Sequence, residues 1–252
     1  MRTFEKSGRA FPCRAHIATA ILSLNIFTTA FAEPITYTGE YDANVLPTDT
    51  EGSSNHPLWE IMAQEVGTTA HIEGDVLVAS TTESIGPNIL FWGIGDNDGR
   101  LVGTDQAWSI NPENGVTVDF RIQVTATKPH KNTESHLDGG FMIQVVDGER
   151  GVNFYFSPNG ITAQGASISK SDPMNLSTGY TNFRITMQDG KASLYQAEFE
   201  TPIFSDIVGT ETLRGYNRII FGDFTSDFSG SYNLKFIKWN NTLANFSAPA
   251  SP

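Results

Sequence analysis

The stretch Val116-Thr117-Val118-Asp119-Phe120-Arg121-Ile122-Gln123-Val124 alternates apolar and polar side chains without a break. A period of two is typical of a β-strand that packs one face on a core and turns the other to solvent. The stretch therefore predicts a strand whose five apolar side chains are buried. Asp119, Arg121 and Gln123 are expected to point outwards.

The same signal returns along the rest of the chain. Alternation over Phe141–Val145 and Phe183–Met187 predicts two more strands, and Asp147-Gly148, Asn159-Gly160 and Asp189-Gly190 predict hairpin turns. Further strands are expected at His71–Ser80, Asn88–Ile94, Val152–Phe156, Ala192–Phe199, Arg218–Phe221 and Tyr232–Trp239. Leu58–Val66 fits a short helix or a strand, and its β neighbours favour a strand. Short strands separated by Gly, Asn and Asp turns indicate an all-β, two-sheet antiparallel sandwich.

Residues 1–32 have the pattern of a signal peptide. Four basic residues precede an apolar run, Ile17–Phe31, and Ala30-Phe31-Ala32 supplies the small-x-small site at which a signal peptidase cleaves. The protein is therefore expected to be secreted or periplasmic, with one sandwich domain over residues 33–243. Residues 244–252 are rich in Ala, Ser and Pro and are expected to form a disordered tail. The only cysteine, Cys13, lies in the signal peptide, so the mature chain is expected to lack disulfides and thiolate ligands.

The charge of the chain restricts its partners. Removal of residues 1–32 takes away four Lys or Arg and one Glu, which changes the formal net charge from −12 to −15. So acidic a surface repels nucleic acid and anionic lipid, and no apolar run long enough to span a membrane follows residue 32. We therefore expect neither nucleic acid binding nor membrane insertion, and a neutral ligand or a cation is favoured.

Four short segments carry a resemblance to a known superfamily. They are Pro57-Leu58-Trp59, Gly74-Asp75-Val76-Leu77, Phe183-Arg184-Ile185 and Gly230–Trp239. In this order they resemble the concanavalin A-like lectin/glucanase superfamily, in particular its laminin-G-like bacterial members. The resemblance implies a two-sheet jelly roll in which one curved sheet offers a concave face. That face binds sugars in many relatives.

The glucanase motif of the superfamily is incomplete in this chain. Retaining glucanases of this kind carry Glu-x-Asp-x-x-Glu on one strand, which places the acid and the nucleophile on one face. Here Glu40-Tyr41-Asp42 is followed by Val45, and Glu73-Gly74-Asp75 is followed by Val78, so both lack the third acid. A retaining glucanase is therefore not favoured.

Arg121, Gln123, Gln144 and Tyr155 are the predicted ligand-binding residues. We expect them to converge on the outward face of neighbouring strands. A forked cation, two amides and a phenol are groups that bind sugar hydroxyls or carboxylates. The other interpretation is an ordinary polar sheet surface. No catalytic residue is predicted.

Other candidate residues favour structural roles. The loop Gly95-Asp96-Asn97-Asp98-Gly99 and the segment Asp223–Asp227 could hold calcium, but both also make ordinary turns, and a full shell of about six to eight oxygens is not evident. The histidines are scattered without zinc-site spacing. Glu198 and Glu200 fit a solvated pair, and Trp92 and Trp108 fit the core better than a sugar platform. No metal or cofactor is expected, with a structural calcium ion as the alternative.

The sequence therefore favours an exported, lectin-like protein that recognises a polysaccharide on its concave sheet. One alternative is a polysaccharide lyase that acts on a uronate-containing glycan at the same face; if the chain is an enzyme, a lyase is expected rather than a retaining glucanase. The other is a non-catalytic structural surface or matrix protein. A convergent base beside Arg121 would favour the lyase, and a flat, evenly polar face would favour the structural protein. No oligomeric state is predicted.

Overall fold

The computed structural model describes residues 37–50, 59–83, 89–97, 100–102, 113–129, 140–171, 173–197, 199–211, 217–224 and 228–243. These residues lie within one unit, 32–246, and contain seventeen β-strands, one short 3-10 turn (η1, Pro47–Asp49) and no α-helix. None of these residues belongs to a helix long and apolar enough to cross a membrane. The predicted signal peptide and tail lie outside the described residues.

Eight strands form sheet A. Seven follow one another in the order β14-β13-β12-β7-β17-β4-β3, and β1 pairs with β17; all pairs are antiparallel. The strands are β1 (Gly39–Asp42), β3 (Thr69–Ile72), β4 (Leu77–Ser80), β7 (Val116–Pro129), β12 (Thr181–Gln188), β13 (Lys191–Gln196), β14 (Phe204–Val208) and β17 (Phe228–Asn240).

Nine strands form sheet B. Its order is β11-β10-β9-β8-β16-β5-β2, with β15 paired to β9 and β6 paired to β5, again all antiparallel. The strands are β2 (Glu60–Gln64), β5 (Ile89–Asn97), β6 (Arg100–Val102), β8 (Phe141–Asp147), β9 (Arg150–Ser157), β10 (Gly160–Gln164), β11 (Ile168–Lys170), β15 (Thr210–Glu211) and β16 (Asn217–Phe224).

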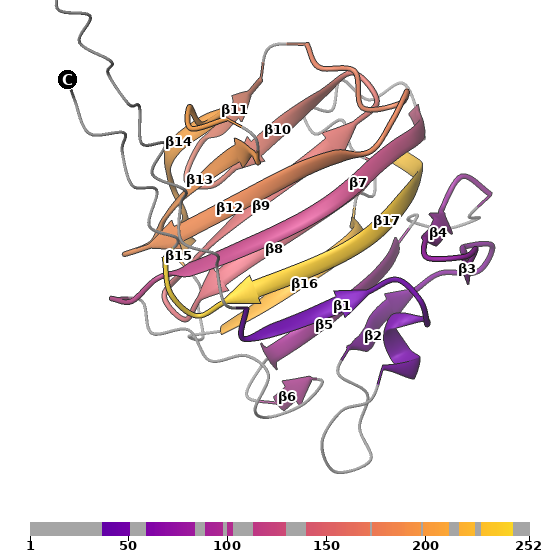
Figure 1. Cartoon of the computed structure of the whole chain (residues 1–252), viewed down its shortest axis with the longest axis horizontal. Helices are drawn as coiled ribbons and strands as arrows, with labels where there is room; N and C mark the ends of the chain where they lie inside the picture. The colour runs from indigo at the N-terminus through magenta and orange to yellow at the C-terminus, as the bar shows by residue number, and fades with distance from the viewer. Residues whose placement is uncertain are drawn as a thin grey trace, which may run out of the picture. The chain divides into compact units, whose positions relative to one another are not determined.

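The two sheets lie face to face. Figure 1 shows β12, β7 and β17 of sheet A in front of β9, β8 and β16 of sheet B. Most of the buried apolar side chains of the two sheets form a single cluster, which is the core of the sandwich. The predicted all-β, two-sheet antiparallel sandwich is confirmed.

The alternation over residues 116–124 is also confirmed. The five apolar side chains of this part of β7 are all 0% exposed and belong to the core. Asp119, Arg121 and Gln123 therefore lie on the opposite, outer face of sheet A, since successive side chains of a strand point to opposite faces.

Aromatic side chains fill much of the core. Trp59 packs edge-on against Phe221 with ring centroids 4.9 Å apart and against Trp239 at 5.8 Å, and Trp92 stacks on Phe221 at 5.4 Å. Such pairs each add about 0.5–1.5 kcal/mol beyond area burial. Trp92 is 2% exposed, so it is a core residue and not a sugar platform. Trp108 lies outside the described residues.

One predicted strand is two strands. His71–Ser80 was expected to be continuous, but β3 ends at Ile72 and β4 begins at Leu77. Gly74 has φ +65° in the turn between them, and Glu73 N donates to Val76 O at 2.9 Å. The polar Glu73-Gly74-Asp75 interrupts the apolar alternation, which is the physical reason for the break. The strand favoured for Leu58–Val66 is present as β2.

Candidate functional site

The four predicted ligand-binding residues lie on two different sheets. Arg121 and Gln123 belong to β7 of sheet A, whereas Gln144 and Tyr155 belong to β8 and β9 of sheet B. Each pair is on the outer face of its own sheet, so the pairs lie on opposite sides of the sandwich. The prediction that all four converge is wrong. The reason is that β7 pairs with β12 and β17, while β8, the next described strand, crosses to the other sheet and pairs with β9 and β16.

Gln144 and Tyr155 are part of a hydrogen-bonded group on the outer face of sheet B. We call Arg218, Gln144, Asn153, Gln164 and Tyr155 the amide row; its members come from the adjacent strands β16, β8, β9 and β10. Arg218 Nε donates to Gln144 Oε1 at 3.0 Å, and Gln144 Nε2 donates to Asn153 Oδ1 at 2.7 Å. Asn153 Nδ2 donates to Gln164 Oε1 at 3.3 Å.

Tyr155 of β9 is the last member of this hydrogen-bonded group, next to β10. Its Oη donates to Gln164 Oε1 at 2.9 Å and accepts a hydrogen bond from Asn153 Nδ2 at 3.2 Å. The amide nitrogen of Gln164 takes part in none of these bonds. Burial raises the pKa of the Tyr155 phenol, against a smaller opposing effect of the bond from Asn153. The hydroxyl therefore stays protonated at neutral pH and acts as a hydrogen-bond donor and acceptor.

An apolar cluster lies beside the amide row on the same face. Tyr155 belongs to both groups, and the cluster is separate from the main core. Its buried members are Phe91, Met142, Tyr155 and Ile220, packed against the partly buried Met62 and Ala63. We call this group the apolar floor. It places aromatic and aliphatic surface next to a line of amide groups, a combination found in small-molecule sites.

The sequence prediction missed Asn153, Gln164 and Arg218. A local signal existed for the first two, because a hairpin near Asn159 puts residues 153, 155 and 164 on one face of the sheet. The observed two-residue turn is 158–159, which pairs Asn153 directly with Gln164. No local signal existed for Arg218, since β16 reaches β8 through a pairing between distant parts of the chain.

Gln123 is hydrogen-bonded to two other segments on sheet A. Its Nε2 donates to the carbonyl oxygen of Ser177 at 2.7 Å, and its Oε1 accepts from Asn233 Nδ2 at 3.2 Å. Both ends of the amide are thus engaged within the protein. The bond to Ser177 fixes part of the segment that leads into β12.

Arg121 has a different environment on the same face. The Arg121 guanidinium lies 5.6 Å from the ring centroid of Tyr180, and Lys235 Nζ lies 5.2 Å from the same centroid. Lys235 pairs with Asp75 at 2.9 Å. Arg121 Nε is buried and has no hydrogen-bond partner.

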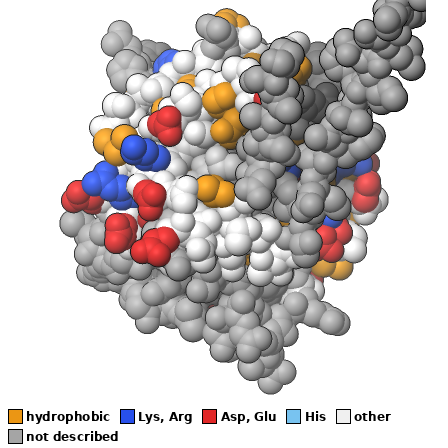
Figure 2. Space-filling view, turned by 60° about the vertical axis from the view of Figure 1, so that its left-hand side comes forward, with side chains coloured by type: hydrophobic (Ala, Val, Ile, Leu, Met, Phe, Trp, Pro, Cys, Tyr) orange, Lys and Arg blue, Asp and Glu red, His pale blue; other side chains and the backbone are white. Residues whose placement is uncertain are grey.

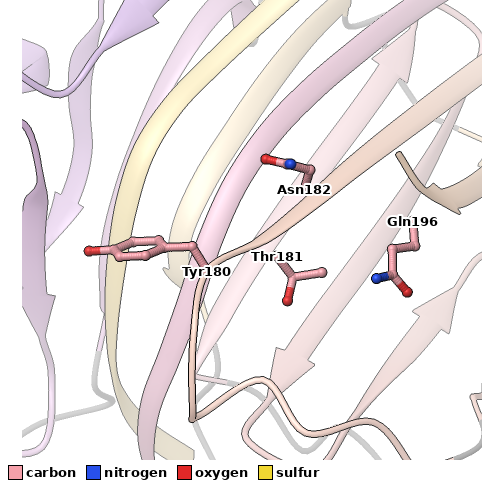
Figure 3. A pocket seen from close by; sticks show the side chains of 4 residues that line it. All are labelled: Tyr180, Thr181, Asn182 and Gln196. Carbon is pink, nitrogen blue, oxygen red and sulfur yellow. The ribbon is translucent and has the colours of Figure 1, made fainter. Parts of the chain in front are cut away.

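A small cavity lies at the start of β12. It has a volume of about 200 Å³ and is lined by Tyr180, Thr181, Asn182 and Gln196 (Figure 3). Asn182 lies directly opposite Arg121 in the pairing of β12 with β7. Figure 3 shows Thr181 and Gln196 on one side, while the Tyr180 ring extends the other way, over β17. Thr181 is paired with Ile122 and Gln196 with Phe183, so these two side chains lie on the inner side of sheet A, opposite to Arg121.

Two further basic side chains on this face, Arg184 and Lys238, form ion pairs. Arg184 binds Asp119 through two hydrogen bonds of 2.6 Å, and Tyr37 Oη donates to the same carboxylate at 2.5 Å. Lys238 pairs with Glu40 at 2.9 Å. On the face of the molecule that Figure 2 shows, most described Lys and Arg side chains likewise lie next to Asp or Glu side chains.

The residues that the sequence suggested as metal ligands or catalytic acids do not form a metal site where the structure describes them. Across the described part of the chain, no three His, Cys, Asp or Glu side chains are grouped to hold a metal ion. Asp223 is 1% exposed and accepts a bond from Thr81 Oγ1 at 2.5 Å, so it is a buried structural carboxylate. Glu200 is exposed. Asp98, Asp227, Glu198 and most of the histidines lie outside the described residues.

Comparison with known proteins yields structural neighbours only. No family model matches the chain, and no curated protein matches it. Similar solved structures include a sialidase (10% identity, TM-score 0.49, 82% of this chain and 19% of the sialidase chain). A β-1,3-glucanase from Mycobacterium marinum is 11% identical, with TM-score 0.43 and coverage of 81% of this chain and 99% of the glucanase. The exoplasmic/lumenal domain of VIP36, in a form bound to Ca²⁺ and Man2, is 10% identical, with TM-score 0.46 and coverage of 83% and 90%.

These neighbours share 10–11% identity with this chain, at TM-scores of 0.43–0.49. At such identities and TM-scores they assign no activity to this chain, because one fold serves many functions. The side chains on the two outer faces must carry any functional conclusion.

Proposed function

We propose that this chain is an exported carbohydrate-binding protein whose ligand lies across the outer face of sheet B, at the amide row. The observation that carries the proposal is the line of Gln144, Asn153 and Gln164 over three adjacent strands, joined by hydrogen bonds to a phenol and a guanidinium. An amide both donates and accepts hydrogen bonds, as a sugar hydroxyl does. A fixed row of amides is therefore suited to a polyhydroxyl ligand.

The dimensions and surroundings of the row also fit a saccharide. Adjacent strands lie about 4.8 Å apart, so the row spans about 14 Å over its four strands, enough for a short oligosaccharide. At the edge of the apolar floor, the partly buried Met62 and Ala63 offer apolar surface for the C–H faces of sugar rings. A formal net charge of −12, or −15 without residues 1–32, favours a neutral ligand over a polyanion on this face.

The lyase alternative receives less support from the geometry. It was expected to use Arg121 and Tyr155 on one face, but Arg121 lies on sheet A and Tyr155 on sheet B. The arginine in the amide row is Arg218, whose Nε donates to Gln144. Burial raises the Tyr155 pKa, whereas a tyrosine that removes a proton near neutral pH needs a lowered one. The structural-protein alternative predicts no glycan binding at all.

The test is a glycan-array screen of the purified chain, followed by calorimetric titration of the best ligand. Asn153→Ala should weaken that ligand at least about tenfold, because loss of one or two hydrogen bonds to a buried partner costs roughly 1.4 kcal/mol or more. Gln164→Ala, at the end of the row, should weaken it as well. Gln123→Ala on sheet A is the matched control and should leave the affinity unchanged.

Melting curves for all three variants separate lost binding from lost folding. A folded protein that binds no glycan on the array would favour the structural alternative. Binding that is lost in Gln123→Ala and kept in Asn153→Ala would place the ligand on the wrong sheet for this proposal. An assay for unsaturated uronate products, run on the same preparation, tests the lyase alternative directly.

A further inference from the structure

The side-chain amide of Gln164, at the β10 end of the amide row, is hydrogen-bonded through its oxygen alone. Gln164 Oε1 accepts from Tyr155 Oη at 2.9 Å and from Asn153 Nδ2 at 3.3 Å. A carbonyl oxygen has two lone pairs, so this acceptor is fully used. Among the residues that the structure describes, none accepts a hydrogen bond from Gln164 Nε2. Gln164 therefore offers N–H donors, and no acceptor, to a ligand on this face.

This orientation of the Gln164 amide is set from the opposite end of the row. A guanidinium can only donate, so the atom that meets Arg218 Nε must be the oxygen of the Gln144 amide. The nitrogen of Gln144 then requires the oxygen of Asn153, whose nitrogen in turn requires the oxygen of Gln164. An inverted amide at any of these positions would place two donors or two acceptors against each other. The row is thus a one-way chain of hydrogen bonds that ends in the N–H groups of Gln164.

An exposed apolar side chain lies next to these N–H groups. Ile168 of β11 pairs directly with Gln164, so the two side chains share a face, with Cβ atoms about 4.5–5.5 Å apart. That face is the outer one, because Ile161 and Ala163 of β10 belong to the core and side chains alternate along a strand. Ile168 is 46% exposed. The β10–β11 end of sheet B therefore combines an amide that only donates with an accessible apolar surface.

An acetyl group matches this combination better than a sugar hydroxyl does. A hydroxyl both donates and accepts, so its own hydrogen would find no acceptor on Gln164, and it has no apolar part to contact Ile168. The carbonyl oxygen of an acetyl group only accepts, and the methyl group bonded to the same carbon is apolar. Carbohydrates carry acetyl groups on nitrogen, as acetamido sugars, or on oxygen, as acetate esters.

We propose that the amide row binds a neutral sugar unit that carries an acetyl group, and that Gln164 and Ile168 form the subsite for this group. The inference rests on the proposed function, because it names the class of sugar that the same site takes. Gln164 Nε2 donates to the acetyl carbonyl oxygen, and the methyl group packs against Ile168. Gln144 and Asn153 remain for the hydroxyls of the ligand. Gln164 and Ile168 thus determine specificity.

The test uses two matched pairs of probes in calorimetric titrations of the purified chain. Triacetylchitotriose and cellotriose share a β-1,4-linked glucose backbone and differ in their acetamido groups. O-acetylated xylotetraose and the same compound after mild alkaline deacetylation differ in their acetate esters. In at least one pair, the acetylated probe should bind at least tenfold more tightly than its match. The pair that shows this preference distinguishes an acetyl group on nitrogen from one on oxygen.

Two variants locate the subsite. Gln164→Glu keeps the shape of the side chain and an oxygen for Asn153 and Tyr155, but replaces the N–H donors by an acceptor. It should weaken the acetylated probe at least tenfold, whereas the unacetylated match, whose hydroxyls can donate to the carboxylate, should bind as well as before or more tightly. Ile168→Thr should weaken the acetylated probe at least threefold. This variant also serves if Gln164→Glu does not fold.

The matched control for Ile168→Thr is Val45→Thr. Val45 follows β1 of sheet A and is 40% exposed, so the substitution changes a similarly exposed apolar side chain away from the amide row. It should leave the affinity for every probe unchanged.

Equal binding within both pairs, or no binding of any of the four probes, would overturn the acetyl subsite. The proposed function would still stand if a glycan from the array lost affinity in Asn153→Ala, and it would fail as well if the array found no ligand. An acetyl preference that survives both Gln164→Glu and Ile168→Thr would place the acetyl group elsewhere and would also overturn this inference.

Discussion

Asp119 lies on the outer face of β7 and is nevertheless only 7% exposed. Arg184 holds both of its oxygens and Tyr37 donates to one of them. Asp119→Ala would remove the carboxylate that holds the largely buried Arg184 by two hydrogen bonds. We expect the free energy of unfolding, measured by urea denaturation, to fall by about 3 kcal/mol, the loss typical of breaking one side of a buried pair.

The matched control is Glu40→Ala. Glu40 pairs with Lys238 on the same sheet, but its side chain is 55% exposed. An exposed pair of this kind contributes at most about 1 kcal/mol. Equal losses in the two variants would show that enclosure of Asp119 by Arg184 and Tyr37 has no energetic effect.

Tyr37 makes the stability that the Tyr37, Asp119 and Arg184 group contributes depend on pH. Burial, together with the hydrogen bond to Asp119, raises the Tyr37 pKa from 10.0 to about 12. Because the pKa is higher in the folded state, the contribution of the neutral phenol to stability is complete below pH 10 and is lost as the pH rises towards 12. As the pH rises from 9 to 11, the free energy of unfolding should therefore fall less in Tyr37→Phe than in the unchanged chain. Urea denaturation at each pH measures this difference. Parallel pH profiles would contradict the raised pKa.

The sequence predicts which side chains of β7 face outwards, but it predicts few of the residues that they contact. Alternation places Asp119, Arg121 and Gln123 outwards, and the structure agrees. It does not reveal that Tyr37 and Arg184 enclose Asp119, or that Tyr180 covers Arg121, because those partners are distant in the chain. Contacts of that kind depend on strand pairing.

Among the elements, β17 of sheet A comes close to the start of β8 of sheet B at Gly230. A Cβ added there would lie 2.1 Å from the Cα of Gly140, just before β8. Gly230→Ala would therefore force backbone apart, and we expect a loss of at least about 2 kcal/mol in the free energy of unfolding, as for other overpacked sites. Gly179→Ala is the control, since nothing lies within 4 Å of its added Cβ. It should be neutral within about 0.5 kcal/mol.

Strands and turns were predictable from local signals, whereas sheet membership was not. Asp189-Gly190 forms the turn between β12 and β13 as expected, and Asp189 takes the left-handed conformation with φ 49°. By contrast, β7 and β8 occupy different sheets. The residues that β17 pairs with β7 are 99 to 123 positions apart in the chain, and those that β16 pairs with β8 are 70 to 80 apart. No local pattern encodes those pairings, which is why the four predicted site residues were wrongly placed together.

For the whole molecule, we predict that the mature chain begins at Glu33. The physical basis is the basic, apolar and small-x-small succession over residues 1–32. Intact-mass measurement on protein recovered outside the cytoplasm should give the mass of residues 33 onwards and no reaction with a thiol reagent. Recovery of a chain that retains Cys13 would contradict this prediction.

We also predict that stability does not depend on calcium. The described residues offer no grouping of three acidic or histidine side chains, and calcium needs about six to eight oxygen ligands. EDTA should change the melting temperature by less than about 2 °C, since a site with no appreciable affinity adds no binding energy to the folded state. A drop of many degrees that added calcium reverses would point to the segments around Asp98 or Asp227.

The position of β17 bears on when the protein can fold. This strand lies in the middle of sheet A, between β7 and β4, and also pairs with β1, the first strand described. Among the described strands it is the last to be synthesised. Sheet A therefore cannot be completed until β17 has left the ribosome. A chain that stays incompletely folded until then suits a secretion channel that admits only unfolded chains.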